Sequence, residues 1–359
     1  MTFPRLRIAV VLVATALGLA PLPSETVERW YSSALYPVIQ SALTWGSNLV
    51  PFALFDILLL VVVGWWVWRF ARDISRRQPS VRGWLRVLTG LIARTLTVTA
   101  ALYVLFLLTW GFNYRRPSIT DRLALNPQGV TPEAARQLVL TAIREVNTLY
   151  PEAHASVTDE DDTPAVEGSL ATAFSRTQAM LAVNAPARPA RPKRTLLDPY
   201  FTSAGVAGMT DPYFLETLLA SDLLPIERPF VVAHEWSHLS GFANEGEANF
   251  VGWLTCLRGS ALDRYSGWLF LYSEALPGLP RPARTEASAL LAAGPRDDLR
   301  AIADRLRRHV RPRISNAGWQ VYDRYLKANR VEAGGASYRE VVRTVLAARF
   351  DAAWAPVLK

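Results

Sequence analysis

Long apolar stretches dominate the first third of the chain. They cover residues about 6–22, 49–70 and 85–110, and each is close to the roughly 20 residues that an α-helix needs to cross a bilayer. Segment 30–46 carries aromatic side chains of the kind that settle at a membrane interface, namely Trp30, Tyr31, Tyr36 and Trp45. The pattern predicts a transmembrane region over residues 1–111, with three membrane-spanning helices and a short interfacial segment.

The pattern changes after residue 112 to shorter segments. Helical segments dominate from Phe230 to the C-terminus, and the apolar run 213–219 is short enough to be a strand. A strand at this place could hold an extended peptide by edge pairing or could be an ordinary buried strand. Residues 112–359 are therefore expected to form a mostly helical α+β domain.

The distribution of charge orients the predicted helices. The loop between the second and third apolar stretches contains a single acid, Asp73, against six arginines: Arg69, Arg72, Arg76, Arg77, Arg82 and Arg86. The positive-inside rule places such a loop in the cytoplasm, and Arg5 and Arg7 place the N-terminus there too. Three crossings then put residues 112–359 on the extracytoplasmic side.

The charge and the cysteine content of the chain limit the kinds of partner and metal site that it can have. The formal net charge of +8 is carried mostly by scattered arginines without a nucleic-acid-binding motif. We therefore expect the lipid bilayer, and not a nucleic acid, as the partner of the basic residues. Cys256 is the only cysteine, which excludes an intramolecular disulfide and a cysteine-rich zinc site. Asp56 and Arg94, inside predicted spans, either mark a polar pathway or pair within the helix bundle.

The strongest chemical signal is an HExxH motif, His234-Glu235-Trp236-Ser237-His238, in a stretch without a helix breaker. Two histidines four residues apart lie on one face of a helix, so both imidazoles can bind one zinc ion. Glu235 then lies beside the zinc-bound water, where a carboxylate acts as general base. A chance match on a structural helix is the simpler alternative, but a glycine and two carboxylates follow at suitable positions.

The third zinc ligand has two candidates. A catalytic zinc ion usually has three protein ligands and one open position. Gly241 predicts the end of the motif helix, and Glu245 and Glu247 follow it. If Asn244 caps the next helix, Glu247 falls at the capping-box position, which leaves Glu245 for zinc. We expect one zinc ion per chain on His234, His238 and either Glu245 or Glu247.

Three tyrosines near the C-terminus, Tyr322, Tyr325 and Tyr338, are candidates for the donor that stabilises an oxyanion in such enzymes. Aromatic packing between helices is the simpler interpretation of each. The residue type alone does not distinguish the two.

Residues 245–249 resemble the ExxA(D/N) element of glutamate-liganded zinc peptidases. The resemblance implies Glu245 as the third ligand and Asn249 as a supporting residue that holds a ligand histidine by hydrogen bond. Six residues separate His238 from Glu245, which is fewer than in most such enzymes. The interval is closer to that of metzincins, which use a third histidine where this chain has Asn244.

The wider pattern resembles a family of uncharacterised bacterial membrane proteins with a domain of unknown function. The resemblance is carried by residues 31–37, 51–58, 110–114, 234–250, 322–329, 337 and 338. The family implies a zincin-like fold and a multi-pass protein of the bacterial inner membrane, with no established substrate.

Together these features predict a membrane-bound zinc metallopeptidase that hydrolyses peptides or proteins of the cell envelope. The alternative is a non-catalytic, zinc-binding membrane scaffold or regulator. Glu235 favours the enzyme, because a structural zinc ion needs no adjacent base. Hydrolysis of a non-peptide amide would use the same residues, and the oligomeric state stays open.

Overall fold

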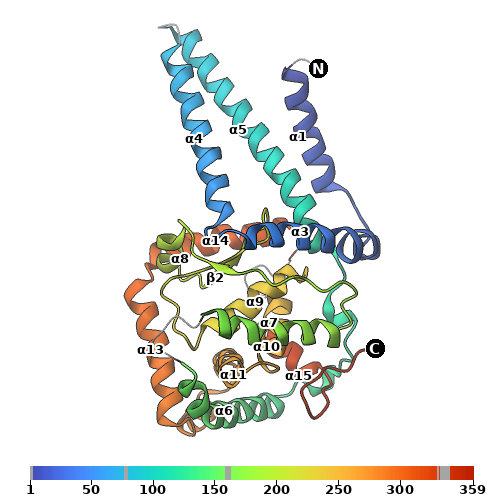
Figure 1. Cartoon of the computed structure of the whole chain (residues 1–359), viewed down its shortest axis with the longest axis vertical. Coiled ribbons are helices and arrows are strands. Elements are labelled where there is room, and N and C mark those ends of the chain that lie inside the picture. Colours follow the sequence, from blue (N-terminus) through green and yellow to red (C-terminus); the bar gives the residue numbers. More distant parts are fainter. Residues whose placement is uncertain (1–2, 77–79, 158–162, 330, 332–339) are drawn as a thin grey trace.

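Three helices project from a broader helical body (Figure 1). The computed structural model describes residues 3–76, 80–157, 163–329, 331 and 340–359. The projecting helices are α1 (Phe3–Leu19), α4 (Leu54–Ser75) and α5 (Val81–Thr109). The described part is mostly helical with one small sheet, which confirms the prediction of a mostly helical chain.

Two of these helices, α4 and α5, are long and apolar enough to cross a membrane. The first predicted crossing differs, because residues Arg5–Leu19 and Ser24–Asn48 form a pair bent by 115°. The described residues thus contain two candidate spans, or three if the bent pair is one span. The second span begins later than predicted because the chain turns at Pro51 before it becomes helical.

The predicted interfacial segment is helical and lies against the body (Figure 1). It comprises α2 (Ser24–Val27), the π-helix η1 (Glu28–Leu35) and α3 (Tyr36–Asn48). Polar residues of α3 hold it in place: Gln40 exchanges hydrogen bonds with the main chain of Arg188, and the Thr44 hydroxyl donates to the Leu215 carbonyl at 2.9 Å. The aromatic segment is therefore an integral part of the body.

The body surrounds a core of large side chains on α9, α10 and α11, including Trp236, Trp253 and Tyr265. Its helices are α6 (Pro132–Ala155), α7 (Thr163–Met180), α8 (Asp198–Ala204), α9 (Arg228–Leu239), α10 (Glu245–Cys256), α11 (Ala261–Ala275), α12 (Arg281–Ala289), α13 (Ala293–His309), α14 (Pro312–Ala328) and α15 (Glu340–Ala347). Short 3-10 turns are η2 (Gly111–Arg115), η3 (Ile119–Asp121), η4 (Pro127–Gly129) and η5 (Leu276–Gly278). The motif helix α9 thus lies in the core.

A three-stranded sheet lies beside α9. Its order is β1 (Pro192–Lys193), β3 (Thr217–Leu219) and β2 (Gly208–Thr210), with β3 parallel to β1 and antiparallel to β2. Only the end of the predicted strand 213–219 is extended, because Leu215 has a left-handed φ of 54°. Since β3 pairs on both sides, edge pairing at 217–219 is excluded, and β2 is an edge of the described sheet.

A buried ion pair joins the sheet to α4. Lys193 Nζ lies 2.6 Å from Glu216 Oε1, and the two side chains are 1% and 0% exposed. The Glu216 carboxylate also accepts hydrogen bonds from the backbone N–H groups of Leu54 and Phe55 at 3.1 and 3.0 Å. These N–H groups belong to the first turn of α4, where backbone N–H groups have no acceptor within the helix. The sheet and the start of the candidate span α4 are therefore held together by direct contacts.

The two polar residues inside the predicted spans are both paired. Arg94 of α5 forms an ion pair with Asp73 of α4. Asp56 accepts hydrogen bonds from the Thr195 hydroxyl at 2.6 Å and from the Leu196 N–H at 2.9 Å. Pairing within the bundle and with the body accounts for both residues.

Replacing Glu216 by Gln should lower the free energy of unfolding by about 3 kcal/mol, because the Lys193 charge would stay buried without its counter-charge. Guanidinium unfolding of the detergent-solubilised chain, followed by circular dichroism, measures this. The control is Asp297→Ala, which removes an exposed ion pair with Arg300 and should change the free energy by less than about 0.5 kcal/mol. Equal losses would show that the buried pair contributes no more than a surface pair.

Candidate metal centre

The motif helix α9 ends at a left-handed glycine, as predicted. Gly241 has φ 80°, a conformation that side chains with a Cβ rarely adopt. A Cβ there would also lie 3.0 Å from both Arg116 Nη1 and Asn113 Oδ1. The chain reverses at this point and returns along α9 as α10.

Helices α9 and α10 approach each other closely. A Cβ on Gly252 of α10 would lie 3.0 Å from the main-chain nitrogen of His234 and 3.1 Å from the Cα atom of His234. Asn244 caps α10, because its side chain accepts from the N–H groups of Gly246 and Glu247 at 2.8 and 3.2 Å. The predicted cap is thus confirmed, and it places Glu245 in the first turn of α10, facing α9.

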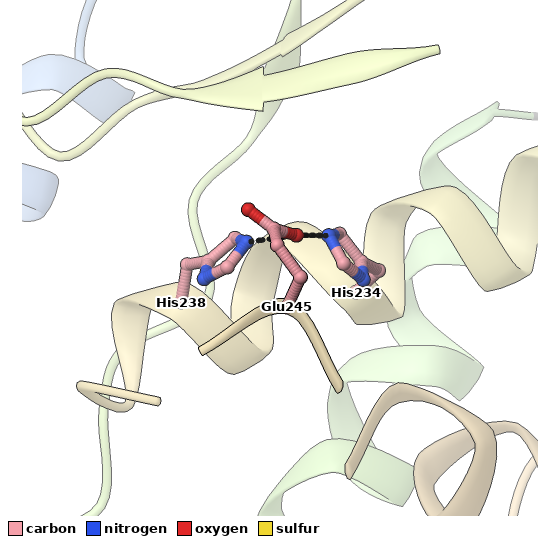
Figure 2. Close-up of side chains that lie close together, drawn as sticks. All are labelled: His234, His238 and Glu245. Atoms are coloured by element: carbon pink, nitrogen blue, oxygen red, sulfur yellow. Dashed lines mark ion pairs between the residues drawn. The ribbon is translucent and has the colours of Figure 1, made fainter. Parts of the chain in front are cut away.

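Glu245 lies between the two motif histidines (Figure 2). Its Oε2 atom is 3.2 Å from His234 Nε2 and 3.5 Å from His238 Nε2. The three ligand atoms all lie within 4.8 Å of one another, and among the described residues this is the group that could hold a metal ion. Tetrahedral zinc with bonds of about 2.1 Å places its ligand atoms about 3.4 Å apart. The two distances from Glu245 Oε2 to the imidazoles match that spacing.

One oxygen of the Glu245 carboxylate lacks a hydrogen bond. Its Oε2 atom is buried and has no hydrogen-bond partner. Its contacts with the imidazoles are longer than the 2.7–2.9 Å typical of a charge-assisted hydrogen bond, and a buried polar atom without a partner destabilises the fold. A cation between these atoms would remove that penalty. Two imidazoles and one carboxylate therefore fit a catalytic zinc ion.

Electrostatics keep the carboxylate ionised. Burial alone would raise the pKa of Glu245, but the neighbouring His238 and His234 lower this pKa well below its usual range. Burial would lower the pKa of His238, yet the charge of Glu245 raises it overall. A metal ion would have to displace the proton that Glu245 stabilises on the imidazole, because histidine binds metals in its neutral form.

The far sides of the two imidazoles differ. His238 Nδ1 lies 2.7 Å from the Phe242 carbonyl oxygen, the kind of contact that orients a metal-binding histidine. His234 Nδ1 has no hydrogen-bond partner. Asn249 is buried on α10, one turn after Glu245, but neither Nδ1 atom bonds to it. The supporting role of Asn249 stays a prediction.

Three side chains from the N-terminal part of the chain satisfy the last carbonyl groups of the motif helix. Trp110 Nε1 donates to the His238 carbonyl at 3.1 Å, and the Tyr36 hydroxyl donates to the Leu239 carbonyl at 2.9 Å. Arg116 donates to the next carbonyl, of Ser240, at 3.2 Å. Reasoning from the motif missed all three, although Tyr36 and Trp110 lie in segments that carried the family resemblance.

Glu235 points towards the sheet. The Thr210 hydroxyl of β2 lies 2.9 Å from Glu235 Oε2 and 2.8 Å from its carbonyl oxygen. Gly208 leaves room for this carboxylate, since a Cβ there would lie 2.9 Å from Glu235 Oε1. Burial raises the pKa of Glu235, and His234 and His238 offset this only in part. No spacing in the sequence identified Thr210 as a partner of Glu235.

Glu247 lies away from the triad. Its Oε1 atom accepts hydrogen bonds from the Ser118 hydroxyl at 2.5 Å and from the Ile119 N–H at 3.0 Å. The capping-box prediction for Glu247 is therefore wrong, because its carboxylate caps the start of η3 and not that of its own helix. The geometry favours Glu245 over Glu247 as the acid beside the histidines.

The candidate tyrosines occupy different places. The Tyr322 hydroxyl of α14 donates a hydrogen bond to Glu245 Oε1, so it lies at the triad. Tyr325 accepts a hydrogen bond from the Tyr114 hydroxyl at 3.4 Å. Tyr338 is outside the described residues. The structure thus brings one of the three candidates to the site.

Replacing Glu245 by Gln should lower zinc affinity more than about 100-fold, because loss of a ligand exceeds the 10- to 100-fold cost of losing an outer-shell partner. Metal analysis of the purified full-length chain should find one zinc ion in the native protein and none in this variant. Glu247→Gln is the matched control and should keep its zinc. Loss of zinc in the Glu247 variant alone would assign the ligand role to that residue.

Comparison with known proteins identifies a family. The family described as "Protein of unknown function (DUF3810)" matches residues 31–346, a range that includes the histidines, Glu245 and the residues that hold them. No curated protein matches the chain, and no solved structure does. The chain therefore belongs to the DUF3810 family of proteins of unknown function.

Proposed function

We propose that the chain is a membrane-bound, zinc-dependent peptidase. The observation that carries this proposal is the buried Glu245 oxygen, which faces the Nε2 atoms of His234 and His238 without a hydrogen-bond donor. Glu235, on the same helix, supplies the adjacent base that a purely structural zinc site does not need.

His234, His238 and Glu245 would hold one zinc ion per chain. Bound zinc acts as a Lewis acid on a substrate carbonyl and brings the pKa of a water molecule towards about 7. Glu235 would accept the proton of the attacking water and pass it to the leaving amine. The Thr210 hydroxyl orients this carboxylate, so that it does not have to be ordered during the reaction.

Tyr322 is the better candidate for the oxyanion donor. Its hydroxyl already lies at Glu245 Oε1, whereas the Tyr325 hydroxyl contacts Tyr114. A donor fixed beside the ligands can stabilise negative charge that develops on the attacked carbonyl.

The position of β2 at the edge of the sheet is an argument for a peptide as the substrate. Ala207 and Asp211, on either side of β2, form main-chain hydrogen bonds with Ala220 and Glu216, on either side of β3. Because inward and outward groups alternate along an antiparallel strand, the main-chain groups of Gly208 and Thr210 point to the outer edge. An extended peptide can pair there. The same two residues contact Glu235, which would bring a bound peptide next to the base.

The charges around α4 and α5 support an extracytoplasmic site in the bacterial inner membrane. Both helices run from the body to a connection that follows Arg69, Arg72 and Arg76. Basic residues at that end mark the cytoplasmic side. The body, at the other end, would then face cell-envelope peptides or proteins.

Glu235→Gln should keep one zinc ion per chain and reduce peptide cleavage by about 100- to 10,000-fold, the usual contribution of a general base. Cleavage of a peptide library by the full-length chain in detergent, with metal analysis of the same samples, measures both quantities. Full activity in a zinc-loaded variant would refute the proposed role of Glu235. A native chain with zinc and no cleavage would favour the non-catalytic scaffold.

Gly208→Ala should reduce cleavage by about tenfold or more without loss of zinc, because small displacements of a catalytic group are costly. The added Cβ would lie 2.9 Å from Glu235 Oε1 and 3.0 Å from Val231 Cγ1, so the carboxylate must move. Gly168→Ala is the matched control, since a Cβ there meets no atom within 4 Å. Equal cleavage rates in the two variants would contradict a role for Glu235 at this position.

A further inference from the structure

The segment around α8 is fastened to the start of the candidate span α4. Asp56, in the first turn of α4, binds the Thr195 hydroxyl and the Leu196 N–H. Phe201 of α8 packs in a small buried cluster with Ala53, the residue before α4. These contacts put α8 and the turn before it at the depth where α4 leaves the body.

Helix α14 is joined to α8 on the same side of the molecule. The Arg311 N–H donates to the Ser203 carbonyl of α8 at 2.8 Å, and a Cβ on Gly318 of α14 would lie 2.8 Å from the Tyr200 hydroxyl oxygen. Figure 1 shows α8 and α14 near α3, at the face from which α4 and α5 rise. This face would be the part of the body nearest to a bilayer that α4 and α5 cross.

Large apolar side chains are exposed on these two segments. We name Leu196, Tyr200, Ile314 and Val321 the α8–α14 face, and their exposed fractions are 64%, 45%, 40% and 67%. Ile314 and Val321 are seven positions apart and therefore lie on one side of α14. Exposed apolar side chains that share one side of a helix are typical of a surface that meets a partner or a membrane. Tyr200 is of a residue type that prefers the headgroup layer of a membrane.

The charges of α14 suit the same environment. Its exposed residues include Arg313 and Arg324, eleven positions apart and therefore on one side of the helix. Arg313 is next to Ile314 and Arg324 is three positions after Val321, so the basic groups lie beside the exposed apolar ones. Basic groups next to apolar ones at a membrane surface attract anionic lipids.

We propose that the α8–α14 face enters the headgroup layer of the bilayer that α4 and α5 cross. The inference depends on α4 as a membrane span and does not require peptidase activity. It gives the body a second attachment to lipid besides its helices. Because α14 also carries Tyr322, which binds Glu245, this attachment would hold α14 across the membrane side of the candidate metal centre.

Spin labels on single cysteines test the inference in the full-length chain, reconstituted in vesicles of phosphatidylethanolamine and phosphatidylglycerol. The labelled variants are Leu196→Cys and Val321→Cys. The matched control is Leu290→Cys, which is 60% exposed and whose carbonyl binds Asn147 of α6, at the end of the body away from the spans. Native Cys256 is fully buried, so the unsubstituted chain serves as the labelling blank.

The measured quantity is the ratio of collision rates with oxygen, which concentrates in lipid, and with a water-soluble nickel chelate. We expect this ratio to be several-fold higher at positions 196 and 321 than at 290. Ratios at 196 and 321 equal to that at 290 would overturn the inference. A water-like ratio at 321 alone would also overturn it, since the two segments are bonded together and must enter the interface as one surface.

Discussion

The structure around the motif helix depends on one buried carboxylate, that of Glu245, which lies between the imidazoles of His234 and His238. An ionised group in the core is strongly unfavourable unless it is paired, and Glu245 can be paired only if α9 and α10 come close. Gly252 permits the close approach, and Gly241 permits the tight reversal between the helices. The glycines, the Asn244 cap and the packing of both helices in the core are therefore consequences of one electrostatic requirement.

The N-terminal helices are built into the same arrangement. Trp110 and Tyr36 satisfy carbonyl groups at the end of the motif helix, and Glu216 satisfies N–H groups at the start of α4. Helix ends that are buried without such partners are costly. Residues on both sides of the predicted boundary at 111 and 112 thus hold one helix end, and the family match likewise includes both parts of the chain.

Local rules account for what the sequence predicted correctly. The spacing of His234 and His238, the turn at Gly241 and the cap at Asn244 depend on residues within a few positions of each other. The contact of Glu247 with Ser118 spans 129 positions, and no local pattern distinguishes it from a capping box. The contact of Thr210 with Glu235 could not be predicted for the same reason, because it forms only when β2 has paired with β3. Helix α6 continues past Pro151, although a proline inside a helix usually kinks or ends it.

The site lies only a few contacts from the start of a candidate span. The first turn of α4 binds Glu216, the residue before β3, and β3 pairs with β2. Thr210 of β2 binds Glu235. From α14, next to the same end of α4, Tyr322 reaches Glu245. Both acids of the site are thus positioned by elements attached at the end of α4. The candidate metal centre is therefore held close to the end of α4, a helix that is long and apolar enough to cross a membrane.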